Sequence, residues 1–74
     1  MSDKTYIIWE GEQAVLSQWY FETGSEVQAG DVLCELSAVK AVIEVEAPVA
    51  GIVKILIGVP ETVVTRGEIL GTIS

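Results

Sequence analysis

The sequence predicts an all-β domain, a flattened β-barrel or sandwich of two antiparallel sheets. Short runs rich in Val and Ile alternate with Gly, Pro and polar turn residues, and no segment keeps a 3.6-residue apolar period. Residues 14–36 also align without a gap on residues 51–73, at an offset of 37 residues. Two such strand–turn–strand units, each too small to bury its own apolar face, can cover one another about a quasi-twofold axis.

The first half of the chain predicts strands at residues 5–9, 14–21, 32–36 and 42–46. Polar and Gly-containing turns separate the first three of them, and residues 26–27 lie between two such turns. Glu44, Val45 and Glu46 alternate acidic and apolar side chains, which is typical of a half-buried strand. We expect the last two strands to form a hairpin with Lys40 at its tip.

The second half predicts strands at residues 52–57, 63–64 and 68–73, after a return turn bracketed by Pro48 and Gly51. Within the repeat, VxxGDVL in the first half falls on VxxGEIL in the second. Gly30 and Gly67 are therefore equivalent turn residues, at which glycine can adopt a positive φ without steric cost. We expect residues 1–74 to form a single domain.

The composition excludes several classes of function. Eleven acidic against four basic residues give a net charge of −7, which excludes the basic surface of a nucleic-acid-binding protein and argues against binding to anionic membranes. One cysteine and no histidine exclude an internal disulfide and the usual zinc sites, and they fit a reducing compartment. No apolar run approaches the length of a membrane span, and the polar start MSDK is no signal peptide. We expect a cytoplasmic, monomeric protein.

The residues that catalysis needs are missing. Without histidine, Cys34 has no imidazole base, and it lies in an apolar strand where a packing role is expected. The carboxylate pairs Glu10/Glu12 and Glu44/Glu46 each fall on one turn or strand face, and we expect them to be solvated, without a cleft that would perturb them. No glycine spacing matches a phosphate-binding loop. The chain is therefore predicted to be non-catalytic and to hold no metal.

Lys40 is the side chain that the predicted fold singles out. Of the three lysines, Lys4 lies near the N-terminus and Lys54 lies on a strand, where an outward side chain is ordinary. A hairpin tip lifts Lys40 away from the body of the domain and leaves its ε-amine open to a modifying enzyme. A solvated turn lysine without a function is the alternative that position alone leaves open.

The segments around this lysine resemble a known family. Residues 30–41 (GDVLCELSAVKA) and 44–51 (EVEAPVAG) are similar to the attachment region of the lipoyl/biotinyl carrier domains. Trp19, ahead of the first Gly turn, matches the lipoyl branch of that family. The resemblance covers residues 14–73, and the internal repeat is the family's own quasi-twofold.

The resemblance implies a lipoyl group attached covalently to Lys40, with Ala38, Val39 and Ala41 as the recognition flank. Val39 and Ser37 stand where the lipoyl pattern has acidic residues. Of the biotinyl pattern Ala-Met-Lys-Met, the chain keeps the first alanine and the lysine. The flanking segments favour lipoate, and biotin stays the alternative cofactor. The PET sequence that replaces Glu-Gly-Asp in the second half is expected to alter one turn remote from the lysine.

The implied function is that of an acyl carrier, whose lipoyl arm shuttles acyl groups and reducing equivalents among the subunits of a 2-oxo acid dehydrogenase-type complex. The implied partners are a lipoate ligase and the dehydrogenase, acyltransferase and flavoprotein components of that complex. Two alternatives remain. One is a biotin carboxyl carrier domain of a biotin-dependent carboxylase, modified by a biotin ligase. The other is an unmodified interaction module of the same fold, which Val39 beside the lysine favours.

Overall fold

Short runs rich in apolar and β-branched residues build eight short strands. The computed structural model describes residues 3–74, and every regular element within these residues is a strand. In chain order the strands are β1 (Thr5–Ile8), β2 (Ala14–Trp19), β3 (Glu26–Val27), β4 (Val32–Ser37), β5 (Val42–Glu46), β6 (Gly51–Ile55), β7 (Val63–Val64) and β8 (Ile69–Ile73). The expectation of an all-β fold is confirmed.

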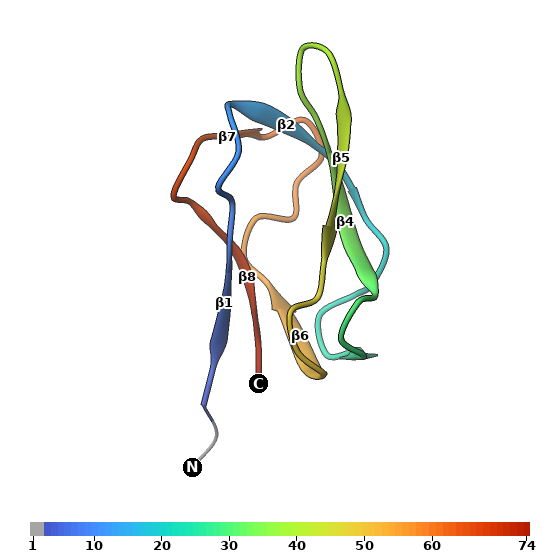
Figure 1. Ribbon diagram of the computed structural model, residues 1–74. Coiled ribbons are helices and arrows are strands. Elements are labelled where there is room, and N and C mark those ends of the chain that lie inside the picture. Colours follow the sequence, from blue (N-terminus) through green and yellow to red (C-terminus); the bar gives the residue numbers. More distant parts are fainter. Residues whose placement is uncertain (1–2) are drawn as a thin grey trace.

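The strands form two antiparallel four-stranded sheets that make a flattened sandwich (Figure 1). The strand order is β1-β8-β6-β3 in one sheet and β5-β4-β2-β7 in the other. Strands β2, β3 and β4 begin 37 residues before β6, β7 and β8, and each takes the place in its sheet that its counterpart takes in the other. The predicted quasi-twofold repeat is therefore confirmed, with β1 and β5 as corresponding edge strands.

Two equivalent glycine turns support the repeat. Gly30 has a φ of 94° and Gly67 a φ of 95°, a region that residues with a Cβ rarely adopt. The carboxylates of Asp31 and Glu68, which follow the two glycines, each accept a hydrogen bond from the backbone amide three residues earlier, at 2.7 and 2.6 Å. The acidic residue therefore closes each turn, which explains the GD and GE pairs of the repeat.

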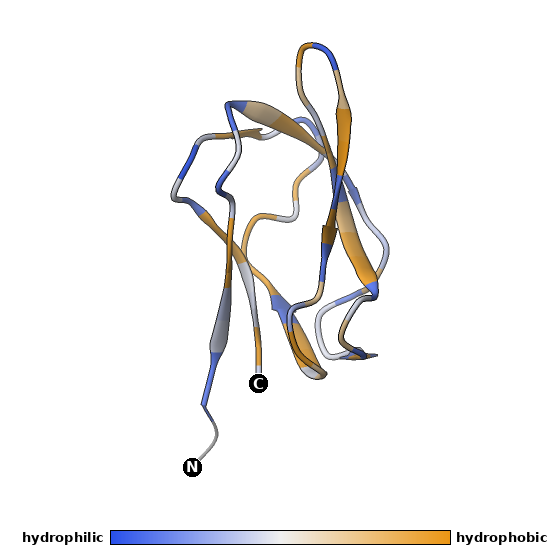
Figure 2. Ribbon diagram, viewed as in Figure 1, coloured by the Kyte–Doolittle hydropathy of each residue, from blue (hydrophilic) through white to orange (hydrophobic). Residues whose placement is uncertain are grey.

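The core lies between the two sheets and takes side chains from both. Its centre consists of fully buried residues, with the lone cysteine among them: Leu16, Val27, Leu33, Cys34, Leu36, Val53, Val64, Leu70 and Ile73. Figure 2 shows that the strands are largely apolar and that the hydrophilic residues gather mostly in the turns. Burial of each aliphatic side chain is worth roughly 1.5–3 kcal/mol, so this set supplies the main stabilising contribution in a short chain.

Two strands end two residues earlier than the sequence predicts, and β1 ends one residue earlier, at Ile8. β2 stops at Trp19, two residues short of the expected end, and β6 stops at Ile55, also two residues short. Beyond β6 the amides of Leu56 and Ile57 both donate to the carbonyl of Leu70, at 3.0 Å each. When one carbonyl accepts hydrogen bonds from two successive amides, the regular pairing of residues across the two strands ends. An apolar run in the sequence gives no sign of such an irregularity.

The turn with the PET sequence lies elsewhere than predicted. Glu61 has a φ of 69° and stands at the place of Gly24, whose φ is 97°. Its amide donates to the carbonyl of Leu16 at 2.7 Å, and Leu16 pairs with Leu36 in β4, the strand that leads to the hairpin tip. The expectation that this turn is remote from the tip is wrong, because β7 folds back beside β2 at the hairpin's end of the molecule.

The sequence predicts that Met1 and Ser74 lie near one end of the domain and Lys40 at the other. The tip of the β4–β5 hairpin and the C-terminus do lie at opposite ends (Figure 1), and Met1 lies outside the described residues. Within residues 3–74, no helix is present that could span a membrane.

Candidate functional site

The tip of the β4–β5 hairpin holds the residues that the sequence singles out. Beyond the last pair of the ladder, the Ala38 amide donates to the Ala41 carbonyl at 2.8 Å. This bond leaves Val39 and Lys40 as the two residues that make the turn. Both side chains are exposed, Val39 to 96%. The tip position of Lys40 is therefore confirmed, whereas its role as an attachment site stays a prediction.

The side chains of all three lysines are exposed, so exposure does not distinguish Lys40 from the others. Its backbone setting does. Lys54 lies within β6 and pairs with Thr72 of β8, so the sheet surrounds its backbone. Lys4 directly precedes β1, towards the end of the molecule opposite the hairpin. Among the lysines, Lys40 is the one in a turn that protrudes beyond the strands, where an enzyme can approach from several sides.

The base of the tip is fixed to the sheet. The hydroxyl oxygens of Ser17 and Ser37 lie 2.8 Å apart, so a hydrogen bond joins β2 to the last residue of β4. Leu36 is fully buried, and Ala38 packs against the core. Ser37, one of the two departures from the lipoyl pattern, thus anchors the hairpin. The residues directly before the tip are therefore held to the neighbouring strand and to the core.

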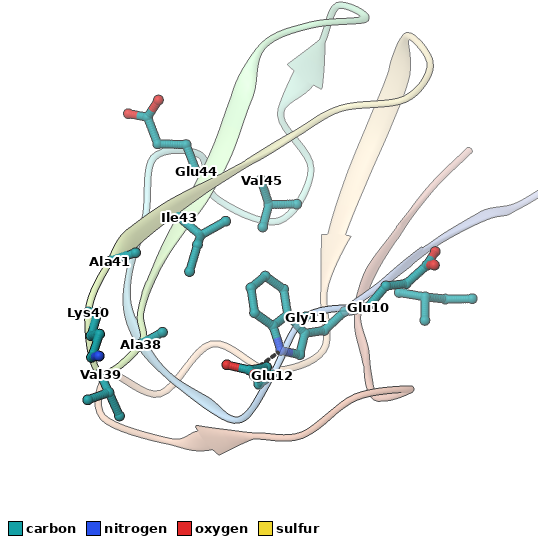
Figure 3. A pocket seen from close by; sticks show the side chains of 12 residues that line it. Glu10, Gly11, Glu12, Ala38, Val39, Lys40, Ala41, Ile43, Glu44 and Val45 are labelled. Atoms are coloured by element: carbon teal, nitrogen blue, oxygen red, sulfur yellow. Dashed lines mark hydrogen bonds between the residues drawn. The ribbon is translucent and has the colours of Figure 1, made fainter.

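A groove of about 750 Å³ opens beside the tip (Figure 3). One wall is the hairpin with β5, and the other is the chain that leaves β1 and turns towards β2. Its mostly apolar lining consists of Ile8, Trp9, Glu10, Gly11, Glu12, Ala38, Val39, Lys40, Ala41, Ile43, Glu44 and Val45. The groove brings together all four sequence-predicted site residues.

Trp9 and Gly11 also belong to this site, although the sequence predicts neither as a site residue. The Trp9 side chain is 6% exposed, and its Nε1 donates to the carbonyl of Glu12 at 2.8 Å, the bond dashed in Figure 3. A Cβ on Gly11 would lie 2.6 Å from the indole Cζ2 atom. Glycine at this position therefore leaves room for the ring. The sequence signal for this contact is a tryptophan two residues before a turn glycine.

A groove lies beside three of the carboxylates that the sequence predicts to be solvated. Glu10, Glu12 and Glu44 line it, whereas Glu46 does not. No local pattern predicts this arrangement, because the two walls come from distant segments. All four side chains are exposed, as predicted, and Figure 3 shows the Glu10 and Glu44 side chains directed away from the groove.

Cys34 packs in the core, as predicted. Its side chain is fully buried, and burial raises the pKa of the thiol to about 12. The thiol is therefore neutral at ordinary pH and cannot act as a nucleophile. Within residues 3–74, no group of His, Cys, Asp and Glu side chains is arranged to hold a metal ion.

Two comparisons with known proteins bear on the site. The family model for biotin-requiring enzymes, which describes biotin- and lipoyl-attachment domains, matches residues 8–73. A 30-residue segment is 67% identical to the probable glycine cleavage system H proteins of Thermococcus gammatolerans and Thermococcus kodakarensis, and 63% identical to that of Pyrococcus abyssi. The segment is 40% of this chain and 22% of each relative, so the match spans about a fifth of the relatives' length.

Proposed function

Because this chain belongs to the family of biotin- and lipoyl-attachment domains, we propose that it is a lipoyl carrier whose cofactor is in amide linkage to Lys40. Domains of this family are carriers rather than catalysts, and the family implies a lipoate or biotin cofactor. We propose further that residues 1–74 form one carrier domain. When bound, a lipoyl group supplies a disulfide that accepts acyl groups and electrons.

The observation that carries this proposal is the position of Lys40. Its side chain is exposed, it belongs to a protruding turn, and the strands below the turn are held by the Ser17–Ser37 hydrogen bond. A group in amide linkage to the Nζ atom of Lys40 has open space around it, so the residues present fit a covalently attached cofactor. The chain itself positions the arm and raises its local concentration near the enzymes that use it.

Lipoate is the cofactor that the flanking residues favour. The segment EVEAPVAG forms β5 and the return turn, and Trp19 at the end of β2 matches the lipoyl branch. Biotin is the second candidate, because the matching family model is described as that of biotin-requiring enzymes. An unmodified module is the third, because Val39 stands fully in solvent where the lipoyl pattern has an acid.

The system that we propose for this carrier is a 2-oxo acid dehydrogenase-type complex, with its dehydrogenase, acyltransferase and flavoprotein components as partners and a lipoate ligase as the modifying enzyme. The names of the similar proteins suggest the glycine cleavage system as a second candidate system. We propose a cytoplasmic location for either system.

Intact mass after co-expression with a lipoate ligase or with a biotin ligase tests the function. A gain of roughly 190 Da corresponds to a lipoyl amide and a gain of roughly 230 Da to a biotinyl amide. The proposal predicts the smaller gain with the lipoate ligase. No gain with either ligase would favour the unmodified module, and a gain with the biotin ligase alone would favour the biotin carrier.

A further inference from the structure

We propose that the groove beside Lys40 docks a segment of a partner protein that presents an aliphatic or aromatic side chain between lysines or arginines. The inference rests on the proposed function for the identity of that partner, an enzyme that acts on the arm of Lys40. The shape and charge of the groove belong to the unmodified chain, so docking can be tested without the cofactor.

The interior of the groove fits an apolar side chain. Ile43 and Val45 of β5 direct their side chains into it in Figure 3, and both are partly buried and packed against the core. The Trp9 indole contributes to the facing wall, where its one polar atom is already bonded to the Glu12 carbonyl. An apolar hollow of about 750 Å³ that stays open at the surface is typical of a binding site.

The border of the groove fits basic residues. Glu10, Glu12 and Glu44 line it and are exposed, against one positive side chain, that of Lys40. Because the Glu10 and Glu44 side chains point away from the apolar interior, they leave it free and are open to an approaching partner. An apolar centre with a charged border is the usual anatomy of a protein interface.

Modification of Lys40 strengthens this complementarity. An amide on the ε-amine removes the one positive charge of the lining and leaves the three carboxylates. The net charge of −7 then becomes more negative, which favours encounter with a basic partner. The groove of the modified chain is therefore expected to bind a basic segment more tightly than that of the unmodified chain.

Two other occupants fit less well. A second copy of this chain would bring three carboxylates against an identical set, which like-charge repulsion disfavours. The cofactor on Lys40 would have to fold back on its own base, since the lysine is itself part of the lining. Both occupants are outcomes that the experiment can reveal.

The test is an NMR titration of the unmodified chain with the capped peptide Gly-Arg-Leu-Arg-Gly, followed through the two indole N–H signals. Trp9 lines the groove, whereas Trp19 donates its indole N–H to the Ile57 carbonyl at 2.7 Å and lies outside the lining, so it serves as an internal control. We expect the Trp9 signal to shift and the Trp19 signal to stay. Capped Gly-Glu-Leu-Glu-Gly and Gly-Arg-Ser-Arg-Gly are expected to leave both signals in place.

Charge variants separate the border from the interior. The double variant Glu12→Gln/Glu44→Gln should weaken peptide binding by about three- to tenfold, as the loss of two exposed ion pairs implies. The matched control Glu46→Gln/Glu61→Gln, which removes two exposed carboxylates outside the lining, should leave the affinity unchanged. The neutral Lys40→Gln variant should bind more tightly than the wild type.

Four results would overturn the proposal. In the titration, these are equal shifts of the Trp9 and Trp19 signals, a Trp9 shift as large with the acidic or the serine peptide as with Gly-Arg-Leu-Arg-Gly, and no Trp9 shift at millimolar peptide. The fourth is an equal peptide affinity of the two double variants. A Trp9 shift on lipoylation that prevents peptide binding would assign the groove to the cofactor, and a concentration-dependent shift without peptide would assign it to a second copy. A failure of Lys40 to accept a cofactor would leave the titration intact, so the two proposals fail separately.

Discussion

Trp9 and Ala47 occupy equivalent positions in the two halves of the fold. The Trp9 amide donates to the Glu68 carbonyl at 2.9 Å and its carbonyl accepts from the Gly67 amide at 2.7 Å. The Ala47 amide and carbonyl make the same pair of bonds with Asp31 and Gly30, both at 2.8 Å. The backbone is therefore symmetric where the side chains are not. An indole on one side and a methyl group on the other give the hairpin's end of the molecule an aromatic wall.

Gly11→Ala tests how this wall is built. The new Cβ would lie 2.6 Å from the Trp9 ring, so the indole must move, and we expect a loss of about 1–3 kcal/mol in the free energy of unfolding. Gly58→Ala is the control, because its Cβ would meet only the terminal Cγ2 of Ile55, at 2.9 Å, and that methyl group can shift. Urea denaturation of both variants gives the comparison. Equal losses would show that Gly11 makes no special room for the ring.

Glu61→Gly is expected to stabilise the domain. Glu61 holds a φ of 69°, a conformation that costs a residue with a side chain about 1 kcal/mol, and glycine removes that cost. The expected gain in the free energy of unfolding is up to about 1 kcal/mol, since glycine also loses more entropy on folding. Glu61→Ala keeps the Cβ and should gain nothing.

The reciprocal change supplies a second control for this turn. Gly24→Ala introduces a Cβ at a φ of 97°, with no atom within 4 Å of it, so its loss of stability reports backbone conformation alone. A Glu61→Gly variant less stable than the wild type would contradict the equivalence of the two turns.

Cys34 gives the stability a specific pH dependence. Burial raises the pKa of its thiol from 9.0 to about 12. Below the lower value the thiol is protonated in both states, so its contribution to stability is fully present. As the pH rises between the two values only the unfolded chain loses the proton, and stability falls by up to about 1.4 kcal/mol per pH unit.

The matched variant for this dependence is Cys34→Ala. It is less stable below about pH 9 because it leaves a small cavity, but it lacks the thiol titration, so the wild type should lose this advantage as the pH rises further. Denaturation midpoints at several alkaline pH values check this. Parallel curves for the two proteins would mean that the thiol is solvent-accessible in the folded state.

Much of the fold could be predicted because its signals stand in the order of residues along the chain. The residue pairs Asp31/Gly30 and Glu68/Gly67 mark the two turns, and the 37-residue offset places six of the eight strands in corresponding pairs. The ends of strands could not be predicted where two amides share the Leu70 carbonyl, because an irregularity in the ladder leaves no mark on an apolar run.

The candidate site also has a part that could be predicted from the sequence and a part that could not. Lys40 could be placed because a hairpin tip follows from the two strands beside it. The groove could not, since the segments from Ile8 to Glu12 and from Ala38 to Val45 meet only in the folded chain. For the same reason no pattern in the sequence places Glu10, Glu12 and Glu44 beside one groove.

Val39 is the position at which we expect cofactor specificity to be adjustable. Its side chain is 96% exposed beside Lys40, so a substitution changes what an enzyme meets without changing the core. Val39→Asp restores an acid next to the lysine and should speed lipoylation by a general lipoate ligase. Val39→Met with Ala41→Met should raise biotinylation by a biotin ligase instead.

Rates of mass gain for the three proteins under the same conditions measure both effects. Circular dichroism serves as the control for an unchanged fold. Equal lipoylation rates for the wild type and Val39→Asp would show that the ligase reads the position of the hairpin tip rather than the neighbouring acid.

The central claim is that Lys40 is the acceptor, and the most direct measurement is the mass of proteolytic fragments after modification with lipoate ligase in vitro. The account predicts a gain of roughly 190 Da on the fragment that contains Lys40 and no gain on fragments with Lys4 or Lys54. Lys40→Arg should abolish the gain and change the free energy of unfolding by no more than about 0.5 kcal/mol, as for an exposed residue. Lys54→Arg should accept the group like the wild type. A gain on Lys4 or Lys54, or an undiminished gain in Lys40→Arg, would contradict the account.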